Sequence, residues 1–345
     1  MTGTNRHPLP ILKMPSLNKA ALSPSIPEEA NSKLSLQRLV VLLGPTAVGK
    51  SELAIQLAEQ LNGEIISADS RLFYRGMDIG TAKPSSVDRQ RIPHHLIDVA
   101  NPDQTWSLGV FQQQARRAIQ DVNDRGKLPF LVGGTGQYIW AVVEGWQVPP
   151  VQPDPHLRDA LLHWADEIGP GELHHRLEII DPSGAALIDP TNLRRTIRAL
   201  EVSLSSGVRF SEQRRRGVSP YNTLLVGLTR PRSELYQRID ERIQTMLSQG
   251  FVEEVRSLLA QGFSPNLPTL SAIGYGEIVS YLQGRSSLEE AVTQMKRRSR
   301  IFVRRQANWF KTSNAEIHWF QAGPDTAAQI GSLIQGWLGS QADLM

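Results

Sequence analysis

The 345-residue sequence has no cysteine and no long apolar segment. The absence of cysteine excludes disulfides, a thiolate nucleophile and cysteine-bound zinc. No apolar run approaches the roughly 20 residues that a membrane helix needs. The start of the chain also lacks the apolar region of a cleaved secretory signal. We therefore expect a cytoplasmic protein that does not enter a membrane.

The sequence also has little excess of either charge, with 37 Lys and Arg against 34 Asp and Glu and a net charge of +3. Its hydrophobic fraction of 40% is ordinary for a soluble globular protein, and its length suits one large or two medium domains. Because the net charge is small, the places where basic residues cluster are more informative than their total.

Local composition and hydrophobic periodicity predict three parts of the chain. Residues 1–36 are rich in Pro, Ser and Asn without a sustained period, which predicts a disordered tail. Residues 37–147 and 223–345 read as one α/β core, and alternation of strands and helices predicts a mostly parallel sheet with helices on both faces. Residues 148–222 have no clear strand and read as a small all-helical insertion, which begins near Pro149, Pro150, Pro153 and Pro155.

Hydrophobic periodicity predicts the individual elements, with a loop-rich stretch over 69–105. The strands are expected at 39–43, 64–68, 128–132 and 223–228. The helices are expected at 50–61, 107–124, 155–168, 171–180, 191–206, 231–261 and 287–311.

The strongest motif directly follows the first strand and fits the P-loop pattern GxxxxGK[ST] at every fixed position. It consists of Gly44, Pro45, Thr46, Ala47, Val48, Gly49, Lys50 and Ser51. A strand, a glycine-rich turn and a helix N-terminus form a cradle of backbone N–H groups for phosphates. Lys50 would add a full positive charge, and the Ser51 hydroxyl would bind Mg²⁺. The motif leaves open whether the ligand is a nucleotide such as ATP or another diphosphate.

Asp69 lies at the end of the second predicted strand, where ligands of parallel sheets bind. A carboxylate there could order Mg²⁺ or accept a proton from a nucleophile. It could equally cap a turn or helix. The loop Gly133–Thr135 ends the third strand, so three loops are predicted to converge on one site.

Two basic clusters favour a polyanionic partner, and beside a phosphate-binding core they favour nucleic acid. The first comprises Arg194, Arg195, Arg198, Arg209, Arg214, Arg215 and Arg216. The second comprises Lys296, Arg297, Arg298, Arg300, Arg304, Arg305 and Lys311. On a helix, Met295, Phe302 and Trp309 share an apolar face that is expected to pack on the core.

Several of these motifs together resemble the bacterial tRNA dimethylallyltransferases, also called tRNA isopentenyltransferases, from about residue 38 to 320. The resemblance is carried by Gly44–Ser51, Ile66-Ser67-Ala68-Asp69-Ser70, Tyr74-Arg75-Gly76-Met77-Asp78-Ile79-Gly80-Thr81-Ala82-Lys83-Pro84, Pro93-His94-His95-Leu96-Ile97-Asp98, Val132–Gly136, Arg198-Ala199-Leu200-Glu201-Val202, Arg238–Arg242 and Ala272-Ile273-Gly274-Tyr275.

The resemblance implies a P-loop NTPase-like fold and a prenyl transfer with Mg²⁺. Dimethylallyl diphosphate would give its prenyl group to the 6-amino nitrogen of the adenosine 3′-adjacent to the anticodon, position 37, in tRNAs that read codons beginning with U. Asp69 would take the amino proton, and Thr135 would lie near the scissile oxygen. Lys50, Ser51, Arg238 and Arg242 would bind the diphosphate. The tRNA anticodon stem-loop and dimethylallyl diphosphate are the implied partners, and a monomer is expected.

The tRNA contacts that the resemblance implies lie in both predicted domains. They are Asp69, Ser70, Arg71, Leu72, Thr135, Arg158, Arg194, Arg195, Thr196, Ile197, Arg198, Ser271, Ala272, Ile273, Gly274, Tyr275, Gly276, Arg304, Arg305, Gln306, Trp309 and Lys311. Two places depart from the family pattern: Arg71-Leu72 replaces Met-Gln, and Asn308 replaces a threonine.

Two other classes share the P-loop. An adenylate isopentenyltransferase would act on a free nucleotide and would not need the helical insertion or the basic C-terminal helix. A small-molecule kinase would need an ATP base pocket and would leave the motif Asp78–Pro84 unexplained.

Overall fold

The computed structural model describes residues 36–148, 154–213 and 217–342. The predicted tail up to residue 35, the boundary prolines Pro149, Pro150 and Pro153, and Arg214, Arg215 and Arg216 of the first basic cluster lie outside these residues. None of the described helices is long and apolar enough to cross a membrane.

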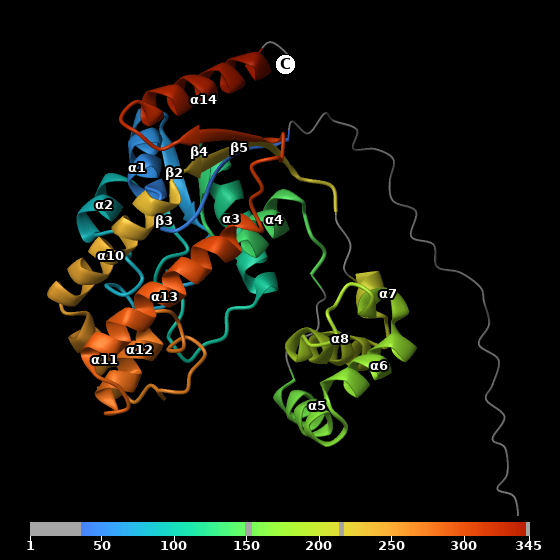
Figure 1. Ribbon diagram of the computed structural model, residues 1–345. Coiled ribbons are helices and arrows are strands. Elements are labelled where there is room, and N and C mark those ends of the chain that lie inside the picture. Colours follow the sequence, from blue (N-terminus) through green and yellow to red (C-terminus); the bar gives the residue numbers. More distant parts are fainter. Residues whose placement is uncertain (1–35, 149–153, 214–216, 343–345) are drawn as a thin grey trace, which may run out of the picture. The chain divides into compact units, whose positions relative to one another are not determined.

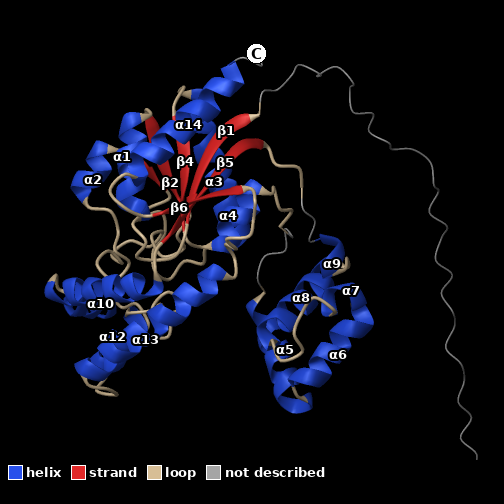
Figure 2. Cartoon of the chain, turned by 45° about the horizontal axis from the view of Figure 1, so that its top comes forward, coloured by secondary structure: helices blue, strands red, loops and turns tan. Residues whose placement is uncertain are grey.

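The core is built on a parallel sheet of six strands in the order β3-β2-β4-β1-β5-β6 (Figure 2). The strands are β1 (Gln37–Leu43), β2 (Gly63–Ser67), β3 (His94–His95), β4 (Leu128–Gly133), β5 (Tyr221–Thr229) and β6 (Ile317–Gln321). β2 and β4 are buried along their whole length, as expected for strands covered on both faces. The predicted α/β class is therefore confirmed.

Helices cover both faces of this sheet, because right-handed crossovers carry them to opposite sides. α1 (Lys50–Gln60) and α14 (Thr326–Ala342) pack together on one face, and α3 (Leu108–Asp124) packs with α4 (Gly136–Val143) on the other. Ser107 caps the N-terminus of α3, because its hydroxyl accepts a hydrogen bond from the backbone N–H of Val110. α2 (Ser86–Arg91) lies within the predicted loop-rich stretch and was not predicted.

Four further helices lie beyond the carboxyl ends of the strands (Figure 1). They are α10 (Arg232–Ser248), α11 (Phe251–Ala260), α12 (Tyr275–Leu282) and α13 (Leu288–Ala307). The prediction of one helix over 231–261 is wrong, because Gly250 has a φ of 94° and separates α10 from α11. A left-handed residue cannot continue an α-helix, and only glycine adopts it freely.

The insertion contains α5 (Pro155–Ile168), α6 (Pro170–Ile180), α7 (Pro182–Ala185), α8 (Leu193–Ser206) and α9 (Phe210–Gln213). Its described part has its own apolar core, formed by Leu161, Ala165, Leu173, Leu177, Ala185, Ile188, Ile197, Ala199 and Leu200. The buried carboxylate of Glu201 pairs with Arg158 and Arg198, and it accepts the backbone N–H of Asp154 at 2.8 Å. This carboxylate therefore ties α8 to the start of α5.

The apolar face predicted for the C-terminal basic helix is only partly buried. Met295 is 2% exposed, but Phe302 and Trp309 are each 39% exposed. The residues of α13 that face the core are Ala291, Met295, Val303 and Gln306. A strict seven-residue spacing drifts by about 20° per heptad on a straight helix, which turns Phe302 toward the surface.

Candidate functional site

The carboxyl ends of four adjacent strands form the site, because β2, β4, β1 and β5 are neighbours in the sheet. β1 leads into the P-loop, β2 into Asp69, β4 into Thr135 and β5 into Arg230. The structure therefore brings together the three loops that the sequence predicts, and it adds a fourth.

The P-loop has the backbone that a phosphate cradle requires. Gly44 has a φ of 148° and Gly49 a φ of 110°, and α1 begins at Lys50. A Cβ on Gly44 would lie 2.7 Å from the carbonyl oxygen of Leu228 on β5, so a side chain there would force the strands apart. Ala47 has a φ of 63°, a costly conformation for a residue with a side chain, which neighbouring contacts must maintain.

Lys50 bends back over this loop. Its Nζ donates to the carbonyl oxygens of Gly44 at 2.9 Å and Pro45 at 2.7 Å. Burial lowers the pKa of Lys50 to about 8, an effect that the carboxylate of Asp69 opposes and the guanidinium of Arg242 increases. The Lys50 ammonium, the Asp69 carboxylate and Arg242 therefore interact within one site.

Asp69 has the capping role that is one of the alternatives left open by the sequence. Its Oδ1 accepts the backbone N–H of Arg71 at 3.0 Å, and its carbonyl accepts the N–H of Leu72 at 3.2 Å. Oδ2 has no hydrogen-bond partner among the residues that the structure describes. One carboxylate oxygen thus fixes the turn at the end of β2.

Thr135 lies next to this turn. Its hydroxyl oxygen is 3.4 Å from the backbone nitrogen of Ser70, which donates to it. Gly133 at the end of β4 allows this approach, because a Cβ there would overlap the carbonyl group of Ala68. Burial raises the pKa of Tyr138, in the first turn of α4, to about 12. The charge of Arg71 lowers this pKa and the charge of Asp69 raises it, both by less than burial does.

Arginines that follow β5 donate hydrogen bonds to backbone carbonyls of the P-loop. The Nε of Arg238 donates to the carbonyl of Ala47 at 2.8 Å, and the Nε of Arg230 donates to that of Val48 at 3.1 Å. Desolvation lowers the pKa of Arg242, and the nearby charge of Arg238 lowers it further. The sequence predicted Arg238 and Arg242 but missed Arg230, whose only signal is its place at the end of a strand before Pro231.

Gln306 joins the site from the end of α13. Its Oε1 accepts the backbone N–H of Thr46 at 2.9 Å, and its Nε2 donates to the carbonyl of Gly134 at 3.0 Å. The side chain is 4% exposed. The predicted contact between this side chain and tRNA is therefore corrected: its amide is buried and bonded to the two loops of the site.

The remaining predicted tRNA contacts divide by burial. The exposed ones are Arg194, Arg195, Ser271, Arg304, Arg305, Trp309 and Lys311. The partly buried ones are Ser70, Arg71, Leu72, Arg158, Arg198, Ile273 and Gly276, and Gly274 is buried. Thr196, Ile197, Ala272 and Tyr275 are buried, so their side chains cannot touch an RNA surface. They shape the local fold instead.

Tyr275 shows what such a buried residue does. Its hydroxyl donates to Glu254 at 2.6 Å, and Glu254 also accepts the backbone N–H groups of Asp78, Ile79 and Gly80. Burial raises the pKa of Tyr275, and the charge of Glu254 raises it further. Together they hold the loop that contains the motif Asp78–Pro84.

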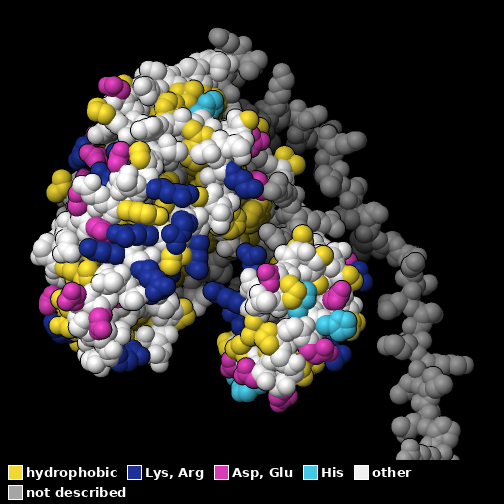
Figure 3. All heavy atoms as spheres, in the orientation of Figure 1, with side chains coloured by type: hydrophobic (Ala, Val, Ile, Leu, Met, Phe, Trp, Pro, Cys, Tyr) yellow, Lys and Arg dark blue, Asp and Glu magenta, His cyan; other side chains and the backbone are white. Residues whose placement is uncertain are grey.

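A basic hollow of about 390 Å³ lies on α13, lined by Thr293, Lys296, Arg297, Arg300, Ile301 and Arg304. Figure 3 shows Lys and Arg side chains gathered on this face, over α10 and α13. Arg300 is paired with Asp240 of α10 at 2.8 Å and lies 5.3 Å from the ring centre of Tyr236. The geometry suits a polyanion with several phosphates.

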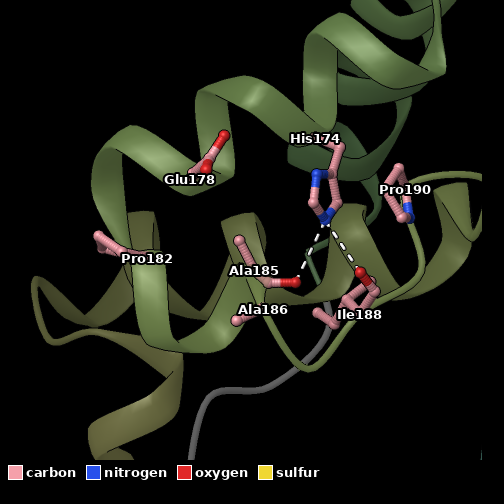
Figure 4. A pocket seen from close by; sticks show the side chains of 7 residues that line it. All are labelled: His174, Glu178, Pro182, Ala185, Ala186, Ile188 and Pro190. Carbon is pink, nitrogen blue, oxygen red and sulfur yellow. Dashed lines mark hydrogen bonds between the residues drawn. The ribbon is translucent and has the colours of Figure 1, made fainter.

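The insertion has a hollow of about 350 Å³ that lacks such chemistry. There His174 lies half-buried, and its Nε2 donates to the carbonyls of Ala185 at 3.3 Å and Ile188 at 3.0 Å (Figure 4). The ring thus links α6 to the last residue of α7 and to the segment that follows it. No group of three or more His, Asp or Glu among the described residues could hold a metal ion.

Comparison with known proteins shows the family to which this chain is similar. Residues 72–313 match the family model described as IPP transferase. The tRNA dimethylallyltransferase of Roseiflexus sp. (strain RS-1) is 47% identical over 300 residues, which cover 87% of this chain and 98% of that protein. The tRNA dimethylallyltransferase of Thermomicrobium roseum is 44% identical over 306 residues, 88% of this chain and 93% of that protein.

Two solved structures are also similar to most of this chain. The tRNA isopentenylpyrophosphate transferase of Bacillus halodurans is 40% identical, with a TM-score of 0.67 over 89% of this chain and 99% of that chain. A eukaryotic dimethylallyltransferase acting on tRNA is 28% identical, with a TM-score of 0.73 over 86% of this chain and 78% of that chain. The P-loop, the carboxylate after β2 and these relatives lead to one conclusion: the chain belongs to the IPP transferase family.

Proposed function

We propose that this protein transfers the dimethylallyl group of dimethylallyl diphosphate to the 6-amino nitrogen of adenosine 37 in tRNA, beside the anticodon, and releases pyrophosphate. The tRNAs would be those that read codons beginning with U. The observation that carries the proposal is that a P-loop and a carboxylate meet at the same edge of the sheet, and that Oδ2 of this carboxylate has no hydrogen-bond partner among the described residues.

The P-loop side of the site suits the diphosphate of the donor. Lys50, Arg238 and Arg242 lie around the loop, and their charges favour a polyanion. The C–O bond of the donor breaks as the new C–N bond forms, so negative charge collects on the departing pyrophosphate. Positive groups that are already in place stabilise that charge without reorganising.

The Asp69 side of the site suits the acceptor. An adenine amino group is a weak nucleophile, so its placement beside the donor carbon matters more than the basicity of its partner. Oδ2 of Asp69 would accept the proton that the amino group loses. Thr135 lies beside Ser70, between Asp69 and the P-loop, where its hydroxyl would donate to the oxygen that leaves the prenyl carbon.

Ser51 is the residue that fits a magnesium ion. It is the second residue of α1, directly after Lys50, and its side chain is exposed at the helix N-terminus. Mg²⁺, when bound, would neutralise part of the diphosphate charge. Hydroxyl and phosphate oxygens are the ligands that this ion prefers.

The basic surface of α13 suits the phosphates of the anticodon stem-loop. The target adenosine must leave its stack to reach Asp69, as in other enzymes that modify a base. The insertion would contribute Arg194 and Arg195, which are exposed on α8. We propose that one copy of the chain suffices for this reaction.

The test is transfer of labelled dimethylallyl from its diphosphate, with Mg²⁺, to unmodified tRNA, with AMP as a parallel acceptor. We expect label in tRNA alone. Label in AMP would indicate an enzyme of free nucleotides. ATP turnover without prenyl transfer would indicate a kinase.

Asp69→Asn sharpens this test, because an asparagine Oδ1 can still accept the N–H of Arg71 and keep the turn. We expect kcat to fall by about 10²–10⁴, while pyrophosphate still binds. Asp103→Asn, at an exposed loop position, is the matched control. If Asp69→Asn retained full activity, the carboxylate would not take the proton.

A further inference from the structure

The amide of Gln306 connects the basic helix α13 with both loops of the phosphate site. It bonds to Thr46 of the P-loop and to Gly134 of the loop after β4, and the Thr46 and Gln306 positions are 260 residues apart in sequence. The fit is tight, because a Cβ on Gly134 would overlap Nε2 of Gln306. A buried amide with both ends bonded cannot move without breaking at least one of these bonds.

A second connection runs through α10. Arg238 and Arg242 of this helix lie one turn apart and face the P-loop, whereas Asp240 between them pairs with Arg300 of α13. Oδ1 of Asp240 and Nε of Arg300 are buried without a hydrogen-bond partner among the described residues. A phosphate that bound Arg300 would therefore act on α10 as well as on α13.

We propose that Gln306 is a positioning residue that couples occupation of the basic surface of α13 by RNA to the affinity of the P-loop for diphosphate. This inference rests on the proposed function, which gives the two sites their ligands. RNA that binds Arg297 and Arg304 holds α13 in place, and the Gln306 amide then holds Thr46 and the left-handed turn at Ala47 in the form that binds phosphate.

The physical basis is the cost of ordering the loop. A loop that is already ordered loses less entropy when its ligand binds, so the second ligand binds more tightly than the first. Coupling of this kind is reciprocal: the factor by which tRNA raises the affinity for diphosphate must equal the factor by which diphosphate raises the affinity for tRNA.

The experiment uses inorganic pyrophosphate with Mg²⁺ as the probe, because it has no prenyl group and cannot react. Calorimetry measures its affinity for the full chain, alone and with saturating unmodified tRNA. For the wild type, we expect tRNA to raise the affinity by at least about fivefold, within the range of known couplings. For Gln306→Met, which removes both hydrogen bonds and keeps the side-chain length, we expect the ratio to fall to within about twofold of unity.

Gln294→Met is the matched control, since it makes the same substitution at an exposed position of α13. It should keep the wild-type ratio. Gly134→Ala disrupts the same hydrogen bond by changing its acceptor residue, because the added Cβ must displace the Gln306 amide. It should lower the ratio as Gln306→Met does, and circular dichroism checks that each variant is folded. If Gln306→Met does not fold, Gln306→Glu replaces it, because it keeps the shape and removes the donor to Gly134.

Two outcomes would overturn the inference: a wild-type ratio within about twofold of unity, or an unchanged ratio in folded Gln306→Met and Gly134→Ala. Failure of the proposed function would look different, because the wild type would then not transfer dimethylallyl to tRNA at all. A wild type that is active, with coupling that does not depend on Gln306, would remove this inference alone.

Discussion

At the scale of single residues, the charge of Lys50 depends on pH in the range where enzymes are assayed. Its pKa is lowered to about 8 chiefly by burial. Below that value the free protein already has the ammonium that a diphosphate needs. Above it the lysine is neutral in the free protein, and binding must take up a proton, so the affinity falls as the pH rises.

We therefore expect the affinity for pyrophosphate to fall by up to about tenfold for each pH unit above the pKa of Lys50. Lys50→Arg stays charged throughout and should lack this loss. Because pyrophosphate itself titrates in this range, the measured quantity is the difference between the two proteins in calorimetry from about pH 7 to about pH 10. Parallel curves would mean that Lys50 does not titrate there.

The sequence predicts the residues of the P-loop and Asp69, because each follows a strand in a local pattern. It does not predict the role of Gln306, since that residue bonds to groups 260 and 172 positions away. Helical periodicity shows only that such a side chain faces inward. Which loop it meets depends on the packing of the whole core.

At the scale of elements, the motif Asp78–Pro84 is explained by a buried lysine. The side chain of Lys83 is 2% exposed and pairs with Asp78 and Asp98. Its Nζ also donates to the carbonyl of Tyr74 at 2.9 Å. Lys83 thus fixes the segment that follows Asp69, and Glu254 fixes the same segment from α11.

Replacement of Lys83 by methionine would leave the carboxylate of Asp78 and the carbonyl of Tyr74 without this cation, and Asp98 would keep only Arg89. We expect a loss of about 3 kcal/mol in the free energy of unfolding, measured with urea. Arg89→Met is the control, because Arg89 pairs with the same Asp98 but its side chain is 37% exposed. It should cost less than about 1 kcal/mol. Equal losses would show that burial of Lys83 is not what matters.

Two of the elements that the sequence missed share a cause. β6 is a short strand, and α14 has glycine and polar residues without a strong helical period. β6 is stable because it pairs with β5 along five residues. Such elements form because of tertiary contacts, which local periodicity does not report.

At the scale of the whole molecule, the basic surface of α13 should give tRNA binding a strong dependence on salt. Arg297→Ala and Arg304→Ala should each lower the slope of log affinity against log salt by about 0.7–0.9. Arg117→Ala, an exposed position on α3, should leave the slope unchanged. Filter binding at several salt concentrations measures it. If neither Arg297→Ala nor Arg304→Ala changes the slope, the phosphates of tRNA do not bind this surface.

The order of the strands has a consequence for synthesis on the ribosome. β1 pairs with β4 and with β5, and the insertion lies between those two strands in sequence. β1, which leads into the P-loop, therefore cannot pair with β5 until the insertion has been synthesised. The P-loop cannot bond to Gln306 until α13 has been synthesised. Contacts of such long sequence separation form slowly. A nascent chain would have its insertion folded before its phosphate site exists, so premature termination anywhere before α13 would yield a protein without a finished cradle.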